Sequence, residues 1–179
     1  MQVHTERLQQ VDPVNVERAM RAMLGLSGYQ AHCGLEPSLL ELVKLRASQI
    51  NGCAYCLDMH TKDARARGES EQRLYLLDAW RESPFYSERE RAALAWTEAV
   101  TLVAETRVPD AVYEDVRRQF SDDELLALTM SVVTINAWNR LNVALRTVPG
   151  TYQPGIFDGV ARDVTLAAGH SGCNKELRT

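Results

Sequence analysis

The sequence has little that would point to nucleic acid or to a membrane. Its 179 residues carry a formal net charge of −4, so it lacks the basic surplus that favours binding to nucleic acid or anionic lipid. No apolar run approaches the roughly 18 residues that a membrane span needs, and the first residues lack the apolar core of a signal peptide. We therefore expect a soluble, cytoplasmic protein with no nucleic-acid and no membrane partner.

Cysteine is scarce as well, since four cysteines in a chain of this length do not make a disulfide scaffold. Two of them, Cys53 and Cys56, form a C-x-x-C pair. In a reducing compartment such a pair indicates redox or metal chemistry. Cys33 and Cys173 stand alone, and we expect them to be bystanders.

Helical signals recur from about residue 13 to residue 146, and together they predict an all-α fold. Two capping boxes mark helix starts, one at Ser87 and one at Ser121, the second opening a helix of roughly 25 residues. Pro13 can open a first helix, which Gly25 and Gly28 are expected to interrupt.

The chain length favours one domain. We place that domain at residues 1–168 and expect residues 169–179 to be a mobile tail.

A helical hairpin is expected around the cysteine pair. Asn51-Gly52 suits the left-handed turn that ends one helix before the next begins. Cys53, Cys56 and His60 are spaced by three and four residues, so on an α-helix they share one face. The hairpin thus brings two thiols and an imidazole together.

Glu41 is an unexpected occupant of the helix before the turn, because that helix is apolar on most sides and a buried carboxylate needs a partner. At about 1.5 Å of rise per residue, Glu41 and His60 reach a similar level in an antiparallel hairpin. Cys56 lies about 6 Å from His60 along the helix. We expect the carboxylate, the imidazole and the thiols to form one proton relay.

The chemistry of such a pair is reversible oxidation. Cysteines at i and i+3 have Cα atoms close enough for a disulfide. A thiolate that attacks a peroxide becomes a sulfenic acid, with which the second thiol condenses. The partial positive charge at the helix start favours the thiolate at Cys53, whereas a base within reach, His60, favours Cys56.

The segment from Leu39 to Gly68, including LRASQINGCAYCLDMH, resembles the core of the AhpD-like alkylhydroperoxidases in the carboxymuconolactone decarboxylase superfamily. The resemblance implies an AhpD-like helical bundle in which Cys56 attacks the peroxide and Cys53 resolves it. It also implies that Glu41 and His60 relay protons.

The same resemblance implies a peroxide substrate and an external dithiol reductant, either a lipoyl carrier or a thioredoxin-like protein. It further implies a homo-oligomer, a trimer or a hexamer. We expect no cofactor. The best-known members carry a second histidine between the cysteines, where this sequence has Tyr55, a poor proton shuttle near pH 7.

Other interpretations stay open. Cys53, Cys56, His60 and Glu41 could instead bind zinc, although we expect no metal. A non-redox decarboxylase of the wider family would use a cation such as Arg46 to hold a carboxylate. A redox sensor would oxidise reversibly without turnover.

One further cluster has a simpler explanation. Trp138, Asn139 and Asn142 are expected to serve helix packing rather than binding.

Overall fold

The computed structural model describes residues 5–30 and 33–156, and within these ranges every regular element is a helix, as predicted. The elements are η1 (Glu6–Leu8), α1 (Pro13–Gln30), α2 (Pro37–Asn51), α3 (Ala54–Ala66), α4 (Glu71–Tyr75), η2 (Leu77–Ala79), α5 (Glu88–Thr101), α6 (Val103–Thr106), α7 (Asp110–Arg117) and α8 (Asp122–Leu145). The predicted domain end at residue 168, the tail 169–179 and Cys173 lie outside the described residues.

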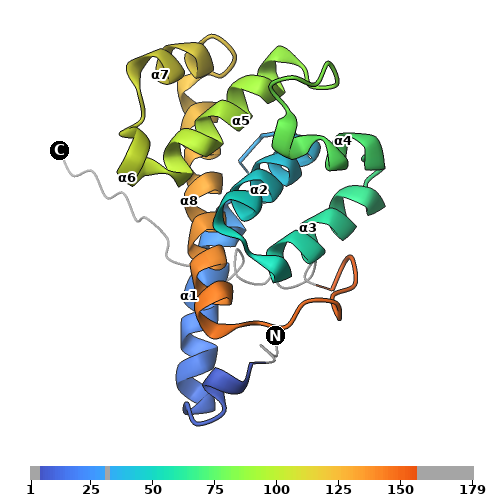
Figure 1. Ribbon diagram of the computed structural model, residues 1–179. Coiled ribbons are helices and arrows are strands. Elements are labelled where there is room, and N and C mark those ends of the chain that lie inside the picture. The colour runs from blue at the N-terminus through green and yellow to red at the C-terminus, as the bar shows by residue number, and fades with distance from the viewer. Residues whose placement is uncertain (1–4, 31–32, 157–179) are drawn as a thin grey trace, which may run out of the picture.

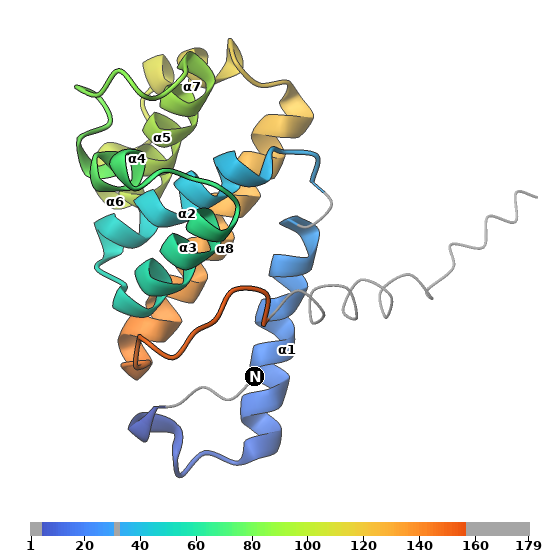
Figure 2. The same ribbon diagram turned by 90° about the vertical axis from the view of Figure 1, so that its right-hand side faces the viewer.

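Helix α2 is the centre of the bundle. It packs against α3, α5 and α8, so three helices cover it on different sides (Figure 1). Its leucines and Val43 are almost completely buried, which agrees with a helix that is apolar nearly all round. Helix α1 lies along α8, and its N-terminal end extends beyond the other helices (Figure 2).

The helix starts follow local chemistry. Ser87 and Ser121 each accept a hydrogen bond from the backbone N–H of a glutamate three residues later, and that glutamate bonds back to the serine N–H. Both predicted capping boxes are therefore confirmed. Ser70 caps α4 in the simpler one-way form.

The predicted interruption of the first helix is wrong, because α1 continues through Gly25 and Gly28 to Gln30. Glycine inside a helix costs only about 1 kcal/mol relative to alanine. Packing of α1 on α8 offsets such a cost: Trp138 on α8 donates its indole N–H to Ser27 Oγ at 3.0 Å, within the segment that contains both glycines.

A small apolar cluster joins the hairpin to α8. Its buried members are Ala47, Cys53, Cys56 and Ile135, with Tyr55 and Trp138 partly buried beside them. The cysteine pair thus faces the longest helix of the bundle. Within the described part of the chain, no helix is both long and apolar enough to cross a membrane.

Candidate active site

The turn between α2 and α3 places the cysteine pair. Gly52 adopts a left-handed conformation with φ of 64°, which ends α2 as predicted. Cys53 is the N-cap of α3 rather than a residue of its first turn, and its sulfur accepts a hydrogen bond from the Cys56 backbone N–H at 3.4 Å. The start of α3 therefore donates directly to one of the two sulfurs.

Both cysteines of the pair are free thiols and each is 1% exposed. Cys33 is half-buried and packs against a different apolar cluster, formed mainly by α2, α5 and α8. This placement keeps the third described cysteine out of the hairpin chemistry.

The two thiols differ in acidity. The Cys56 S–H group, which donates to Cys53, has the largest effect and lowers the pKa of the Cys53 thiol to about 7, although burial opposes the shift. The same hydrogen bond, together with burial, raises the pKa of the Cys56 thiol. In the reduced protein the first negative charge therefore resides on Cys53, in accordance with its position at the helix start.

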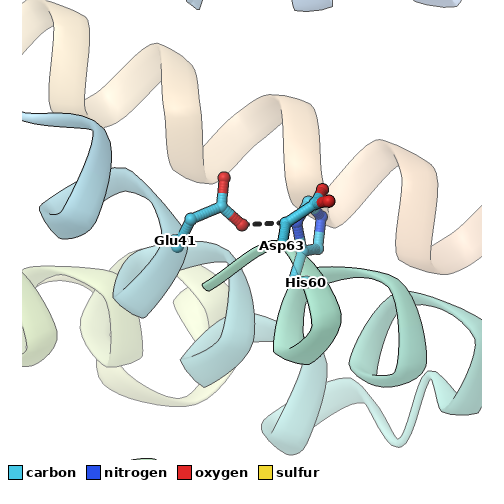
Figure 3. Close-up of side chains that lie close together, drawn as sticks. All are labelled: Glu41, His60 and Asp63. Atoms are coloured by element: carbon cyan, nitrogen blue, oxygen red, sulfur yellow. Dashed lines mark hydrogen bonds and ion pairs between the residues drawn. The ribbon is translucent and has the colours of Figure 1, made fainter. Parts of the chain in front are cut away.

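Glu41 and His60 meet across the hairpin as predicted. The imidazole Nδ1–H donates to Glu41 Oε2 at 2.9 Å, and both side chains are buried (Figure 3). Because Nδ1 is held by the carboxylate, Nε2 is the nitrogen left for proton exchange. His60 follows Cys56 by four residues, so the two residues are one helical turn, about 6 Å, apart along the axis of α3.

Two cations that the sequence reasoning missed complete the environment of Glu41. Lys44 Nζ lies 3.1 Å and Arg67 Nη1 2.7 Å from Glu41 Oε1. Burial by itself would favour the neutral acid, but His60 and Lys44 outweigh it and hold the pKa of Glu41 well below its ordinary value. The carboxylate is therefore charged throughout the physiological pH range.

Two asparagines of α8 reach the sulfurs, although sequence reasoning assigned them to packing. Asn142 donates its side-chain N–H to Cys56 Sγ at 3.5 Å. Asn139 is completely buried, and its amide lies near enough to both thiols to lower their pKa values. The signal available in the sequence was the set of three amides, Asn136, Asn139 and Asn142, in a helix that is apolar on most sides.

The geometry does not support the zinc alternative. Among the described residues, the group whose ligand atoms all lie within 4.8 Å of one another consists of Glu41, His60 and Asp63, and contains neither sulfur. Figure 3 shows these three side chains converging between α2 and α3. Lys44 and Arg67 already neutralise one oxygen of Glu41, which makes that group unsuited to a further cation.

Tyr55, between the two cysteines in sequence, is half-buried. Burial, followed by the nearby Cys56 and Asp58, raises its pKa, so the phenol stays protonated near neutral pH. Tyr55 therefore cannot replace the histidine that the resemblance would lead us to expect.

Arg46, the cation considered for a decarboxylase, is engaged elsewhere. Its guanidinium donates to Glu98 at 2.8 Å and to Gln49 at 3.0 Å, and it also pairs with Asp78. Since its charge is already paired with carboxylates, Arg46 is a poor candidate for holding a substrate carboxylate.

Comparison with known proteins gives a consistent family. Residues 16–99 match the sequence model of the carboxymuconolactone decarboxylase family. The chain is 44% identical over 126 residues to the uncharacterized protein YdfG of Bacillus subtilis. That match covers 70% of this chain and 86% of YdfG. Over 52 residues it is also 44% identical to alkyl hydroperoxide reductase AhpD of Acidobacterium capsulatum. This shorter match covers 29% of this chain and 28% of that protein.

Solved structures show the same fold. A protein of unknown function from Agrobacterium tumefaciens, for which an antioxidant-defence role as AhpD has been suggested, has a TM-score of 0.75 and 44% identity. The match covers 80% of this chain and 99% of that one. The debrominase Bmp8 has a TM-score of 0.64 at 19% identity, covering 84% of this chain and 78% of that one, a likeness in fold alone.

Proposed function

The chain belongs to the carboxymuconolactone decarboxylase family as an AhpD-like member, and from this premise we propose that it is a thiol-dependent hydroperoxidase. The observation that carries the proposal is a buried free dithiol, with one thiol of lowered pKa, one turn from a buried histidine–glutamate pair. An acidic thiol is a competent nucleophile, and a paired imidazole is a competent proton carrier. Packing of the hairpin alone would require neither an acidic thiol nor an imidazole paired with a carboxylate.

The first step is the formation of a sulfenic acid on Cys56. The proton of the Cys56 thiol moves along its hydrogen bond to the Cys53 thiolate, which leaves the charge on Cys56. The proton that Cys53 lost on ionising is carried by His60 on Nε2. The Cys56 sulfur attacks the hydroxyl oxygen of the peroxide, the O–O bond breaks, and the leaving alkoxide takes that proton from His60. The products are Cys56–SOH and an alcohol.

The second step closes the disulfide. His60, neutral after the first step, accepts the Cys53 proton through Nε2 while its Nδ1–H stays bonded to Glu41. The Cys53 thiolate attacks the Cys56 sulfur, and the departing hydroxide takes the proton back from His60 and leaves as water. Overall, two thiols and one hydroperoxide give one disulfide, one alcohol and one water.

The competing assignment makes Cys53 the attacking sulfur, because its pKa is the lower one. We favour Cys56 because it stands one turn from His60 and receives a hydrogen bond from Asn142. Trapping of a sulfenic acid in each single-cysteine variant separates the two assignments.

Turnover requires reduction of the disulfide. We propose that an external dithiol does this by thiol–disulfide exchange, with a lipoyl carrier or a thioredoxin-like protein as the donor. Such donors are maintained in the reducing cytoplasm, where we place the protein, and the family premise favours assembly as a trimer or hexamer.

The test is mass spectrometry of the thiols before and after addition of one equivalent of an alkyl hydroperoxide, followed by turnover with dihydrolipoamide. We expect an intramolecular Cys53–Cys56 disulfide, and loss of turnover in Cys56→Ser. Decarboxylation of a lactone acid that survives replacement of both cysteines would instead support the decarboxylase alternative. Reversible oxidation without turnover would support a redox sensor.

A further inference from the structure

Helix α8 is remote in sequence from the hairpin, yet it sends polar groups to the sulfurs. Asn142 Nδ2 lies 3.5 Å from Cys56 Sγ, across 86 positions of sequence, and it also donates to the Trp138 carbonyl oxygen at 3.0 Å. Asn139, one turn earlier, donates to Ser48 Oγ at 3.0 Å. Both amides are buried, so each is shielded from competing water.

The surrounding hydrogen bonds fix which end of each amide faces the sulfur. A backbone carbonyl can only accept, so the contact with Trp138 requires the NH₂ end of Asn142 on that side. Asn51 donates to Asn139 Oδ1 at 2.9 Å, which holds the oxygen of that amide away from the thiols. Both asparagines therefore present donors to the cysteine pair.

We infer that Asn142, with Asn139 beside it, is a catalytic group that holds the negative charge on the Cys56 sulfur when this sulfur ionises and attacks. Hydrogen bonds to the charged form of a group stabilise that form. In turnover this role rests on the proposed function, but stabilisation of the thiolate is a property of the reduced protein alone. It can therefore be measured without a substrate.

Few other groups bear on the ionisation of Cys56. Cys53 hydrogen-bonds with it, and Tyr55 lies near enough for a charge on Cys56 to raise the pKa of the phenol. His60 follows one turn later on the same helix. The α8 side of the sulfur carries amides rather than charges, so a shift caused by changing Asn142 reports on its hydrogen bond.

The experiment measures the pH midpoint for iodoacetamide alkylation of Cys56, by peptide mass spectrometry, in a Cys53→Ser background. We expect Asn142→Leu to raise the midpoint by about one pH unit, a tenfold change in the acid dissociation constant. Asn142→Asp, which keeps the shape but turns a carboxylate toward the sulfur, should raise it further. Val143→Ala, an exposed neighbour on the same helix, should leave it unchanged.

An unmoved midpoint in a folded Asn142→Leu protein would overturn the inference. If both Asn142 variants fail to fold, NMR of the Asn142 side-chain amide in the Cys53→Ser protein decides: its resonances must shift as Cys56 titrates, and constant resonances refute the contact. If the midpoint rises in Asn142→Leu but the parent protein does not reduce peroxide, the inference about Asn142 holds and only the hydroperoxidase proposal is refuted.

Discussion

The acidity of Cys53 depends mainly on one hydrogen-bond donor, the S–H group of Cys56. This dependence can be tested with a matched pair of substitutions. Cys56→Ser keeps a hydroxyl donor in place of the thiol, whereas Cys56→Ala removes the donor and leaves the backbone N–H that also contacts the Cys53 sulfur. The two variants therefore differ chiefly in whether position 56 can donate from its side chain.

The size of the effect follows from the shift itself. The pKa of Cys53 lies at about 7 instead of 9.0. At pH 7 a thiol with the lower value is about half ionised, whereas one with the ordinary value is ionised to about one part in a hundred. Backbone and Asn139 contacts remain in Cys56→Ala, so we expect its midpoint to rise by more than one pH unit toward 9, with Cys56→Ser staying near 7.

The assay is alkylation of Cys53 with iodoacetamide across a pH series, read from the Cys53 peptide so that Cys33 does not interfere. A more basic thiolate is intrinsically more nucleophilic, so the plateau rate at high pH should be up to about tenfold higher in Cys56→Ala. The midpoint, not the rate at one pH, is the diagnostic quantity. Equal midpoints in the two variants would refute the hydrogen-bond account of Cys53 acidity.

Three further predictions concern the groups around the pair. Because the folded-state pKa of Glu41 lies well below its ordinary 4.5, the unfolded chain binds the extra proton as the pH falls below about 4.5, and the stability due to Glu41 is lost through that acid range. Glu41→Gln should lower the free energy of unfolding by about 3 kcal/mol at pH 7, because it leaves His60 without its buried charged partner. The substitution should also weaken the fall of that free energy between pH 7 and pH 3. Urea titrations over this range that show the same pH dependence as the parent would contradict this. Gly52→Ala forces a side chain into the left-handed region and should lower the free energy of unfolding by about 1 kcal/mol, and a urea midpoint equal to the parent's would argue against strain at the turn. Tyr55→His places a group that titrates near neutral pH beside the cysteine pair, so peroxide-driven disulfide formation at pH 7 should become several-fold faster in stopped-flow measurements. An unchanged rate would contradict the view that Tyr55 limits the reaction by being a poor proton shuttle.

The local parts of this architecture were predictable from the sequence. Ser87 and Ser121 indicate helix starts because a capping box is a contact between residues only three positions apart in sequence. Asn51-Gly52 marks the hairpin turn for a similar reason, and helix rise then brings Glu41 level with His60. Each of these features needs only neighbouring residues or one antiparallel pairing.

Contacts between separate helices were harder to predict from the sequence. The continuation of α1 past Gly25 depends on packing against α8, which no local pattern encodes. Arg67 reaches Glu41 from the end of α3, and Asn142 reaches Cys56 from another helix. Spacing within one helix could not identify them, because their partners are fixed by how separate helices pack.

The central claim is that the Cys53–Cys56 pair reduces peroxide by cycling between dithiol and disulfide. The most direct measurement adds one equivalent of an alkyl hydroperoxide to the reduced protein and follows the pair by intact and peptide mass spectrometry. The account predicts a loss of two hydrogens, located at the Cys53–Cys56 disulfide, with one alcohol formed per disulfide and full recovery on addition of dihydrolipoamide. Peroxide that persists beside a reduced pair would contradict it.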